Sequence, residues 1–177
     1  MALEIVDFGT NILSILTLIG TIYVIIAFLF FILRRKFPIK FVNENSLALI
    51  FIVSLIATLG SLFFSEIAGF TPCKLCWYQR ILMYPLVLIS IIALYKKDNN
   101  VIKYIIPMSI IGGLIAAYHY LLQIGIITTN LPCSTVGYSA SCTEFFILEY
   151  GYITIPMMSL VAFLMIIFLS YNIHKGR

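Results

Sequence analysis

The chain has 177 residues, of which 62% are hydrophobic and only 10% are charged, and its mean hydropathy is +1.10. A soluble domain carries about 25% charged residues, because its surface must be hydrated. This composition excludes a soluble enzyme, a disordered protein and a nucleic-acid-binding protein. It predicts an integral membrane protein with several spans.

Five apolar segments follow one another along the chain, each near the roughly 20 residues that a membrane-spanning helix needs. They cover residues 11–33, 47–64, 77–95, 104–127 and 152–171. Backbone groups inside the hydrocarbon must be paired within their own segment, so each segment is predicted to be an α-helix. The sequence therefore predicts an all-α, multi-pass membrane protein that folds as one compact domain.

The basic residues predict the orientation of these helices. Nine of the 11 follow the first, third and fifth segments, among them Arg34, Lys97 and Lys175. Lys and Arg gather in cytoplasmic loops, which predicts a cytoplasmic C-terminus and an N-terminus outside. Glu4 precedes the first segment and the basic cluster follows it, unlike the order in a cleaved signal peptide, so this segment is predicted to be a retained span. The net charge of +4 thus reflects topology rather than an anionic partner.

The four cysteines all fall in the two predicted outer loops. Cys73 and Cys76 form a Cys-x-x-Cys pair, and eight residues separate Cys133 from Cys142. Disulfides persist outside the cytoplasm, and this arrangement suggests the pairs Cys73–Cys76 and Cys133–Cys142. A bridge that closes so short a loop stabilises little, which points to a redox role for the first pair. Two other readings are a four-cysteine zinc site and two purely structural disulfides.

The residues around Cys76 favour a redox site. Thr71 and Pro72 resemble a helix N-cap and first turn, which would place both thiols at the positive end of a helix dipole that favours a thiolate. Arg80 lies one turn beyond Cys76, inside the predicted span. It is either an interfacial anchor or a fixed positive charge facing a thiolate and a bound electron acceptor.

Three further side chains are candidates for contact with that acceptor. Trp77 and Tyr84 lie on neighbouring turns and could flank a flat aromatic ligand, although aromatic residues are also common at membrane interfaces. His119 is predicted near the outer end of the fourth span, where it would be either a packing hydrogen-bond partner or a group that binds or protonates the ligand.

Cys-Lys-Leu-Cys-Trp-Tyr-Gln-Arg over residues 73–80, followed by Met83-Tyr84-Pro85, resembles the bacterial disulfide-bond formation protein B (DsbB) family. The segments 118–123 and 151–156 resemble its short-loop, BdbC-like branch. The resemblance covers residues 47–171. It implies a four-helix transmembrane bundle over residues 46–177, preceded by an additional transmembrane helix and cytoplasmic loop over residues 1–45.

The resemblance also implies an activity. The protein would reoxidise a thioredoxin-like (DsbA-like) thiol oxidase and pass two electrons to membrane quinone, either ubiquinone or menaquinone, in the bacterial cytoplasmic membrane. Cys133–Cys142 would be the outer disulfide that accepts electrons, with Cys133 forming the mixed disulfide. Cys142 would pass the electrons to Cys73–Cys76, and Cys76 would face the quinone. Arg80 would stabilise negative charge there, with His119 nearby.

The chain differs from the family in two respects: it has an additional N-terminal helix, and the loop between Cys133 and Cys142 is short. Two other functions compete with this one. A vitamin K epoxide reductase-like enzyme shares the chemistry but lacks the Trp-Tyr-Gln-Arg context. A transporter would show internal repeats or broken helices near the midplane, for which only Pro107 and Gly112-Gly113 are weak candidates.

Overall fold

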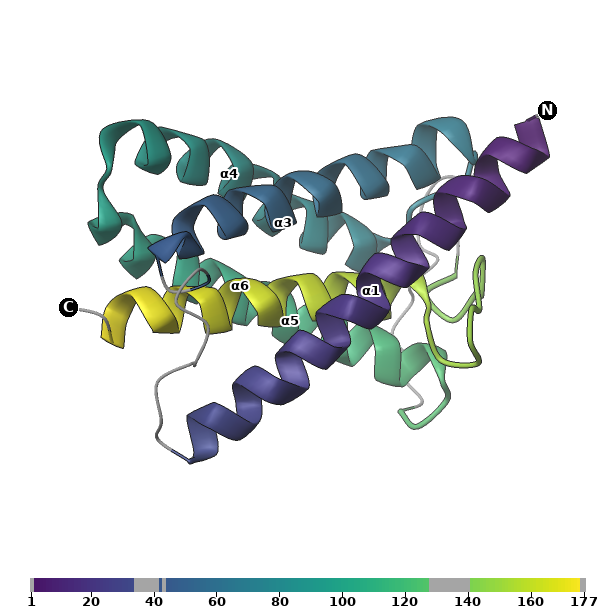
Figure 1. Cartoon of the computed structure of the whole chain (residues 1–177). Coiled ribbons are helices and arrows are strands. Elements are labelled where there is room, and N and C mark those ends of the chain that lie inside the picture. The colour runs from purple at the N-terminus through teal and green to yellow at the C-terminus, as the bar shows by residue number, and fades with distance from the viewer. Residues whose placement is uncertain (1, 34–41, 43, 128–140, 176–177) are drawn as a thin grey trace.

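The structure is a computed structural model that describes residues 2–33, 42, 44–127 and 141–175. Within these ranges the chain is helical and contains no named strand (Figure 1). The helices are α1 (Ala2–Ile32), α3 (Ser46–Leu62), α4 (Lys74–Lys96), α5 (Ile102–Gln123) and α6 (Ile155–Lys175), with a π-helix η1 (Phe63–Ile67) after α3 and a 3-10 turn η2 (Asn99–Val101) before α5.

Among the described residues, five helical segments are long and apolar enough to cross a membrane, which confirms the predicted all-α membrane fold. Several predicted boundaries need correction. The first helix begins at Ala2 rather than at residue 11, the third begins at Lys74 rather than at residue 77, and the fourth ends at Gln123 rather than at residue 127. The fifth begins at Ile155 rather than at residue 152, because Glu149 and Ile153 form an isolated β-bridge that turns the chain before the helix starts.

Helices α3, α4, α5 and α6 pack around a shared apolar core, and α5 and α6 approach each other very closely. Phe163 of α6 is fully buried, and a Cβ atom at Gly112 would lie only 2.3 Å from Cζ of its ring. Membrane helices have little hydrophobic driving force for association, so small residues that permit close packing take its place. Gly112 therefore serves helix packing, and α5 continues unbroken through Pro107 to Gln123.

Helix α1 crosses the other helices obliquely and packs along α6 (Figure 1). Its 31 residues span about 46 Å at 1.5 Å per residue. This exceeds the roughly 30 Å of a hydrocarbon core, so a tilt relative to the membrane is expected. Near its C-terminal end, the rings of Phe28 and Phe31 make T-shaped contacts with the Phe168 ring.

The ends of α3 and α5 and the starts of α4 and α6 lie at one end of the bundle, with the N-terminus, while the C-terminus lies at the other end (Figure 1). The segments that carry Cys73, Cys76 and Cys142 therefore converge on one end of the molecule.

Candidate active site

Helix α4 begins one residue after Cys73, which is its N-cap. This corrects the predicted start at Thr71 and Pro72. Cys73 has extended backbone angles (φ −77°, ψ 172°), and its Sγ accepts a hydrogen bond from the backbone N–H of Cys76 at 3.4 Å. The sulfur thus takes the place of the hydroxyl oxygen that caps most helices. Cys76 is the third residue of the helix, where the dipole favours negative charge on its sulfur.

The two thiols of the Cys-x-x-Cys pair differ in environment. Cys73 Sγ donates a hydrogen bond to Cys76 Sγ at 3.2 Å. Cys73 is buried, with 3% of its surface exposed, whereas Cys76 is half-buried. The hydrogen bond to Cys76, together with burial, raises the pKa of the Cys73 thiol to about 12. Cys73 therefore keeps its proton at neutral pH, and Cys76 is the sulfur placed to carry a negative charge.

His119 of α5 connects the dithiol to Gln79 of α4. Its Nε2 lies 3.6 Å from Cys73 Sγ, and its Nδ1 lies 3.1 Å from Nε2 of Gln79. Both His119 and Gln79 are buried, so these contacts satisfy polar groups that water does not reach. A Gln79 amide that donates to Nδ1 leaves the imidazole proton on Nε2, directed at Cys73 Sγ. The structure thus brings His119 to Cys73, behind the dithiol.

Arg80 is held by Ser61, one residue before the end of α3. Its Nε donates to Ser61 Oγ and its Nη2 to the Ser61 carbonyl oxygen, both at 2.9 Å. This carbonyl lies just before the α-helical hydrogen-bond pattern gives way to η1, and π-helical turns often mark functional sites. Tyr84 donates a longer bond to the same hydroxyl, at 3.4 Å, and the Trp77 ring centroid lies 5.3 Å from the guanidinium carbon.

The second cysteine-bearing segment packs against the first. Cys142, which is 1% exposed, forms one apolar cluster with Cys73 and Leu122, and Cys76 packs against that cluster. Gln123, at the end of α5, donates a hydrogen bond of 2.8 Å to the carbonyl oxygen of Glu144. Cys133 lies outside the described residues, so its pairing with Cys142 stays a prediction.

Stacked aromatic rings join the same two segments beside the cysteines. Phe146 stacks on Phe70 with ring centroids 5.0 Å apart, and Phe70 stacks on Phe64 at 6.1 Å. Each of these rings lines the cavity described next.

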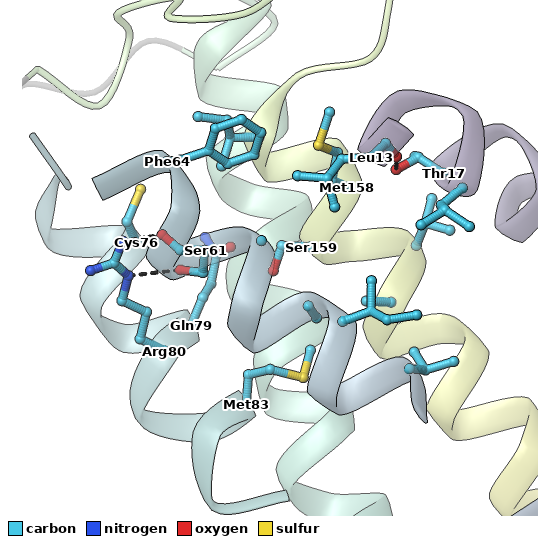
Figure 2. A pocket seen from close by; sticks show the side chains of 18 of the residues that line it. Leu13, Thr17, Ser61, Phe64, Cys76, Gln79, Arg80, Met83, Met158 and Ser159 are labelled. Atoms are coloured by element: carbon cyan, nitrogen blue, oxygen red, sulfur yellow. Dashed lines mark hydrogen bonds between the residues drawn. The ribbon is translucent and has the colours of Figure 1, made fainter. Parts of the chain in front are cut away.

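A cavity of about 250 Å³ lies between α1, α3, α4 and α6 (Figure 2). At one end it is lined by Cys76 and Arg80, with Ser61, Gln79 and Tyr84. Mostly apolar side chains of α1, α3 and α6 line the rest, together with the hydroxyl residues Thr17 and Ser159. Among the described residues on its wall, Arg80 is the only charged one. One cavity therefore combines the Cys76 sulfur, the Arg80 guanidinium and a mostly apolar wall.

The predicted acceptor-binding residues differ in their relation to this cavity. Arg80 and Tyr84 line it. Trp77 is 53% exposed and His119 lies behind the dithiol; neither contributes to the wall. Sequence reasoning assigned no role to Gln79, although it stands within the Trp-Tyr-Gln-Arg motif. It also missed Ser61, which no sequence pattern marks.

The ligand atoms of Cys73, Cys76 and His119 all lie within 4.8 Å of one another, a set that could hold a metal ion. It differs from the four-cysteine zinc site considered from the sequence, because a histidine joins the first pair. A structural zinc ion takes four ligands, so these three would need one more.

A dithiol at the edge of a cavity, in a bundle of membrane-length helices, defines a membrane protein with a candidate thiol redox centre. The sequence model of the family described as "Disulfide bond formation protein DsbB" matches residues 43–172. The chain belongs to this family, and membership supports an oxidoreductase role in disulfide bond formation at a bacterial membrane.

Two relatives show how far the similarity extends. Disulfide bond formation protein C of Bacillus subtilis is 51% identical over 117 residues, covering 66% of this chain and 83% of the relative. The SPbeta prophage-derived disulfide bond formation protein B of the same organism is 45% identical over 118 residues, covering 67% of this chain and 78% of the relative. These relatives support the predicted BdbC-like branch. No solved structure shows significant similarity to the chain.

Proposed function

We propose that the protein is a protein-dithiol:quinone oxidoreductase. It reoxidises a thioredoxin-fold, DsbA-like thiol oxidase and passes the electrons through Cys133–Cys142 and Cys73–Cys76 to ubiquinone or menaquinone. The observation that supports this most strongly is the position of the first pair. Cys73 packs against Cys142 on one side, while Cys76 lines the cavity on the other.

The outer disulfide would receive the electrons by thiol–disulfide exchange. A thiolate of the donor attacks Cys133, which forms a mixed disulfide and releases Cys142 as a thiolate. The donor's second thiolate then breaks the mixed disulfide, so that the donor leaves oxidised and Cys133 and Cys142 are both reduced. Two electrons have moved, and no external oxidant is needed at this stage.

The inner disulfide would then receive the same two electrons. Cys142 attacks Cys73, its neighbour in the buried cluster, the Cys73–Cys76 bond breaks, and Cys76 leaves as a thiolate at the cavity. Attack of Cys133 on Cys142 restores the outer disulfide and releases Cys73, which takes up a proton. His119 holds the Cys73 sulfur in place during these steps.

The residues around the cavity fit a quinone. Away from the end where Cys76 and Arg80 lie, the wall is mostly apolar, with the hydroxyl residues Thr17 and Ser159 among its lining. Arg80 is fixed by Ser61 rather than by a carboxylate that would neutralise it. A bound quinone supplies an acceptor for two electrons and two protons. Arg80 stabilises negative charge on the Cys76 sulfur and at the polar end of the cavity, and Tyr84 presents a hydroxyl on the same wall.

The proposed location is the bacterial cytoplasmic membrane, with the N-terminus and the cysteines outside and the C-terminus in the cytoplasm. Clustering of Cys73, Cys76 and Cys142 at the N-terminal end of the bundle (Figure 1) supports this orientation, together with the distribution of Lys and Arg.

The decisive experiment mixes purified protein, a quinone and a reduced thioredoxin-fold donor, and follows the quinone absorbance. We expect protein-dependent loss of the oxidised quinone with one donor disulfide formed per quinone, and no turnover by folded Cys76→Ser. Undiminished turnover in Cys76→Ser, or no quinone reduction by the unaltered protein, would exclude the proposed activity.

A further inference from the structure

Helix α1 lies outside the part of the chain that matches the family, residues 43–172. The thiol chemistry proposed for residues 43–172 does not explain why the chain has this helix. We propose that α1 forms, with α3 and α6, a binding channel for the isoprenoid tail of the quinone that accepts electrons at the Cys76 end. This inference rests on the proposed function, because it names the part of the chain that would bind the tail of the quinone.

The position of α1 is fixed by small residues on its buried face. From residue 4 onward, the buried positions of this helix are Thr10, Ser14, Thr17, Gly20 and Ala27. Such residues let membrane helices approach closely. They leave little side-chain volume between α1 and the bundle.

Three close contacts hold α1 over the bundle. A Cβ atom at Gly20 would lie 2.8 Å from both Met165 Sδ and Val161 Cγ1 of α6. On the α3 side, the side chain of Leu13 fits against Gly60, where a Cβ atom would lie 3.0 Å from it. Gly9 accommodates the Phe63 ring of η1. Helix α1 therefore bridges α3 and α6.

The space beneath this bridge is the apolar part of the cavity. Leu13, Leu16, Thr17, Ile19 and Gly20 of α1 form one wall. Figure 2 shows Leu13 and Thr17 on the opposite side of the pocket from Cys76 and Arg80. The Thr17 hydroxyl donates to the Leu13 carbonyl of its own helix at 2.8 Å, so its proton is not available to a ligand. The α1 end of the cavity thus suits an aliphatic chain.

The cavity also reaches the lipid-facing surface beside α1. Leu16 and Ile19 of α1 and Ile56 of α3 line the cavity and are nevertheless 40%, 59% and 36% exposed. In a membrane, exposed surface at this depth faces acyl chains. A ligand with one polar end at Cys76 and a long apolar tail can therefore bind at both ends while its tail continues into the bilayer between α1 and α3.

Two substitutions place an aromatic ring in the channel from different helices: Thr17→Phe on α1 and Ala57→Phe on α3, both at lining positions. Ile15→Phe is the matched control, since Ile15 is 49% exposed on α1 and is not on the cavity wall. Binding is measured by quenching of Trp77, the only tryptophan of the chain, which lies beside Arg80. The ligands are a quinone with a tail of several isoprene units and the same ring without a tail.

We expect Thr17→Phe and Ala57→Phe to raise the Kd of the tailed quinone about tenfold, corresponding to the loss of roughly two buried methylene groups. The Kd of the tailless ring should stay unchanged in both variants, and Ile15→Phe should bind both ligands like the unaltered protein. The role of α1 would be overturned if the Kd changed equally for the two ligands. It would also be overturned if a folded channel variant, Thr17→Phe or Ala57→Phe, showed no change in Kd for the tailed quinone. In either case the proposed function would still stand. If the unaltered protein binds neither ligand, the proposed function fails and the tail channel with it.

Discussion

Arg80 of α4 and Ser61 of α3 are joined by two hydrogen bonds of 2.9 Å, one to the Ser61 hydroxyl and one to its carbonyl oxygen. The pair fixes a guanidinium on the wall of an otherwise apolar cavity. A charged side chain at membrane depth is costly unless it is partnered or functional, and here it is partnered without being neutralised.

Substitution of Arg80 should therefore affect the quinone more than the protein donor. We expect Arg80→Ala to raise KM for quinone by about tenfold or more, since hydrogen bonds to charged groups contribute roughly 1.5–3 kcal/mol. KM for the thioredoxin-fold donor should change little. Steady-state kinetics with each substrate varied in turn make the test. Equal effects on both constants would assign Arg80 to folding.

Ser61→Ala should give a smaller effect of the same kind, about fivefold in KM for quinone, because the carbonyl contact remains and one ordinary hydrogen bond contributes about 1 kcal/mol. Ser65→Ala is the control. The Ser65 hydroxyl donates to the Ser61 carbonyl oxygen and to the Glu66 carboxylate, but it does not contact Arg80. A Ser61→Ala protein that matches this control would show that the hydroxyl does not position Arg80.

Cys73, rather than Cys76, should be the partner of Cys142, because Cys73 and Cys142 are both buried within one cluster, whereas Cys76 packs at the edge of that cluster and lines the cavity. In a Cys76→Ser, Cys133→Ser double variant, oxidised glutathione should drive formation of a Cys73–Cys142 disulfide, detectable by peptide mass spectrometry. The matched variant is Cys73→Ser, Cys133→Ser, in which the remaining sulfurs should pair more slowly. Faster pairing in the second protein would reverse the assigned order of attack.

Alkylation of the reduced protein should distinguish the two thiols of the first pair. The pKa of about 12 keeps Cys73 protonated between pH 7 and pH 10, and only the thiolate reacts. Brief iodoacetamide pulses should therefore modify Cys76 first throughout this range. The modification rate of Cys73 should still be rising about tenfold per pH unit at pH 10 rather than levelling off.

Loss of the Cys76 hydrogen bond should lower the pKa of Cys73, because that bond is the largest cause of its increase. Cys73 in Cys76→Ala should thus be alkylated faster at pH 8 than in the unaltered protein. Slower alkylation of Cys73 in this variant would contradict the assigned hydrogen bond.

His119 should act on the dithiol rather than on the quinone, since it contacts Cys73 and Gln79 but does not line the cavity. We expect His119→Phe to lower kcat and leave KM for quinone near its original value. Stability should fall by roughly 1–3 kcal/mol, because buried polar partners lose their contact. Tyr118→Phe, on the neighbouring position of α5, provides the control. A selective rise in KM for quinone would instead place the imidazole in the acceptor site.

The orientation can be tested in a chain whose four cysteines are replaced by serine. Single cysteines introduced at the exposed positions Thr71 and Thr143 should react with an impermeant maleimide added outside intact cells. A cysteine at exposed Lys97, after α4, should react only once the membrane is opened. Labelling of Lys97→Cys from outside would overturn the proposed topology.

The sequence by itself determined the membrane class, the helical fold and the family. These rest on local properties: apolar segments in lipid must form helices, and residues 73–80 carry the Cys-x-x-Cys motif that resembles the family. Even so, a local rule failed at the start of α4, where Thr71 and Pro72 predicted the cap. A cysteine sulfur that accepts the Cys76 N–H takes that position instead, which moves the helix start to Lys74.

The tertiary structure decided which groups meet. Ser61 and Arg80 are 19 residues apart in the chain, and Cys73 and His119 are 46 apart. Such pairs depend on how helices rotate and cross, which hydropathy does not determine. Close packing at Gly20 and Gly60 places α1 against the cavity wall. Hydropathy alone could show that this helix is long and apolar enough to span a membrane, but not which face of the bundle it covers.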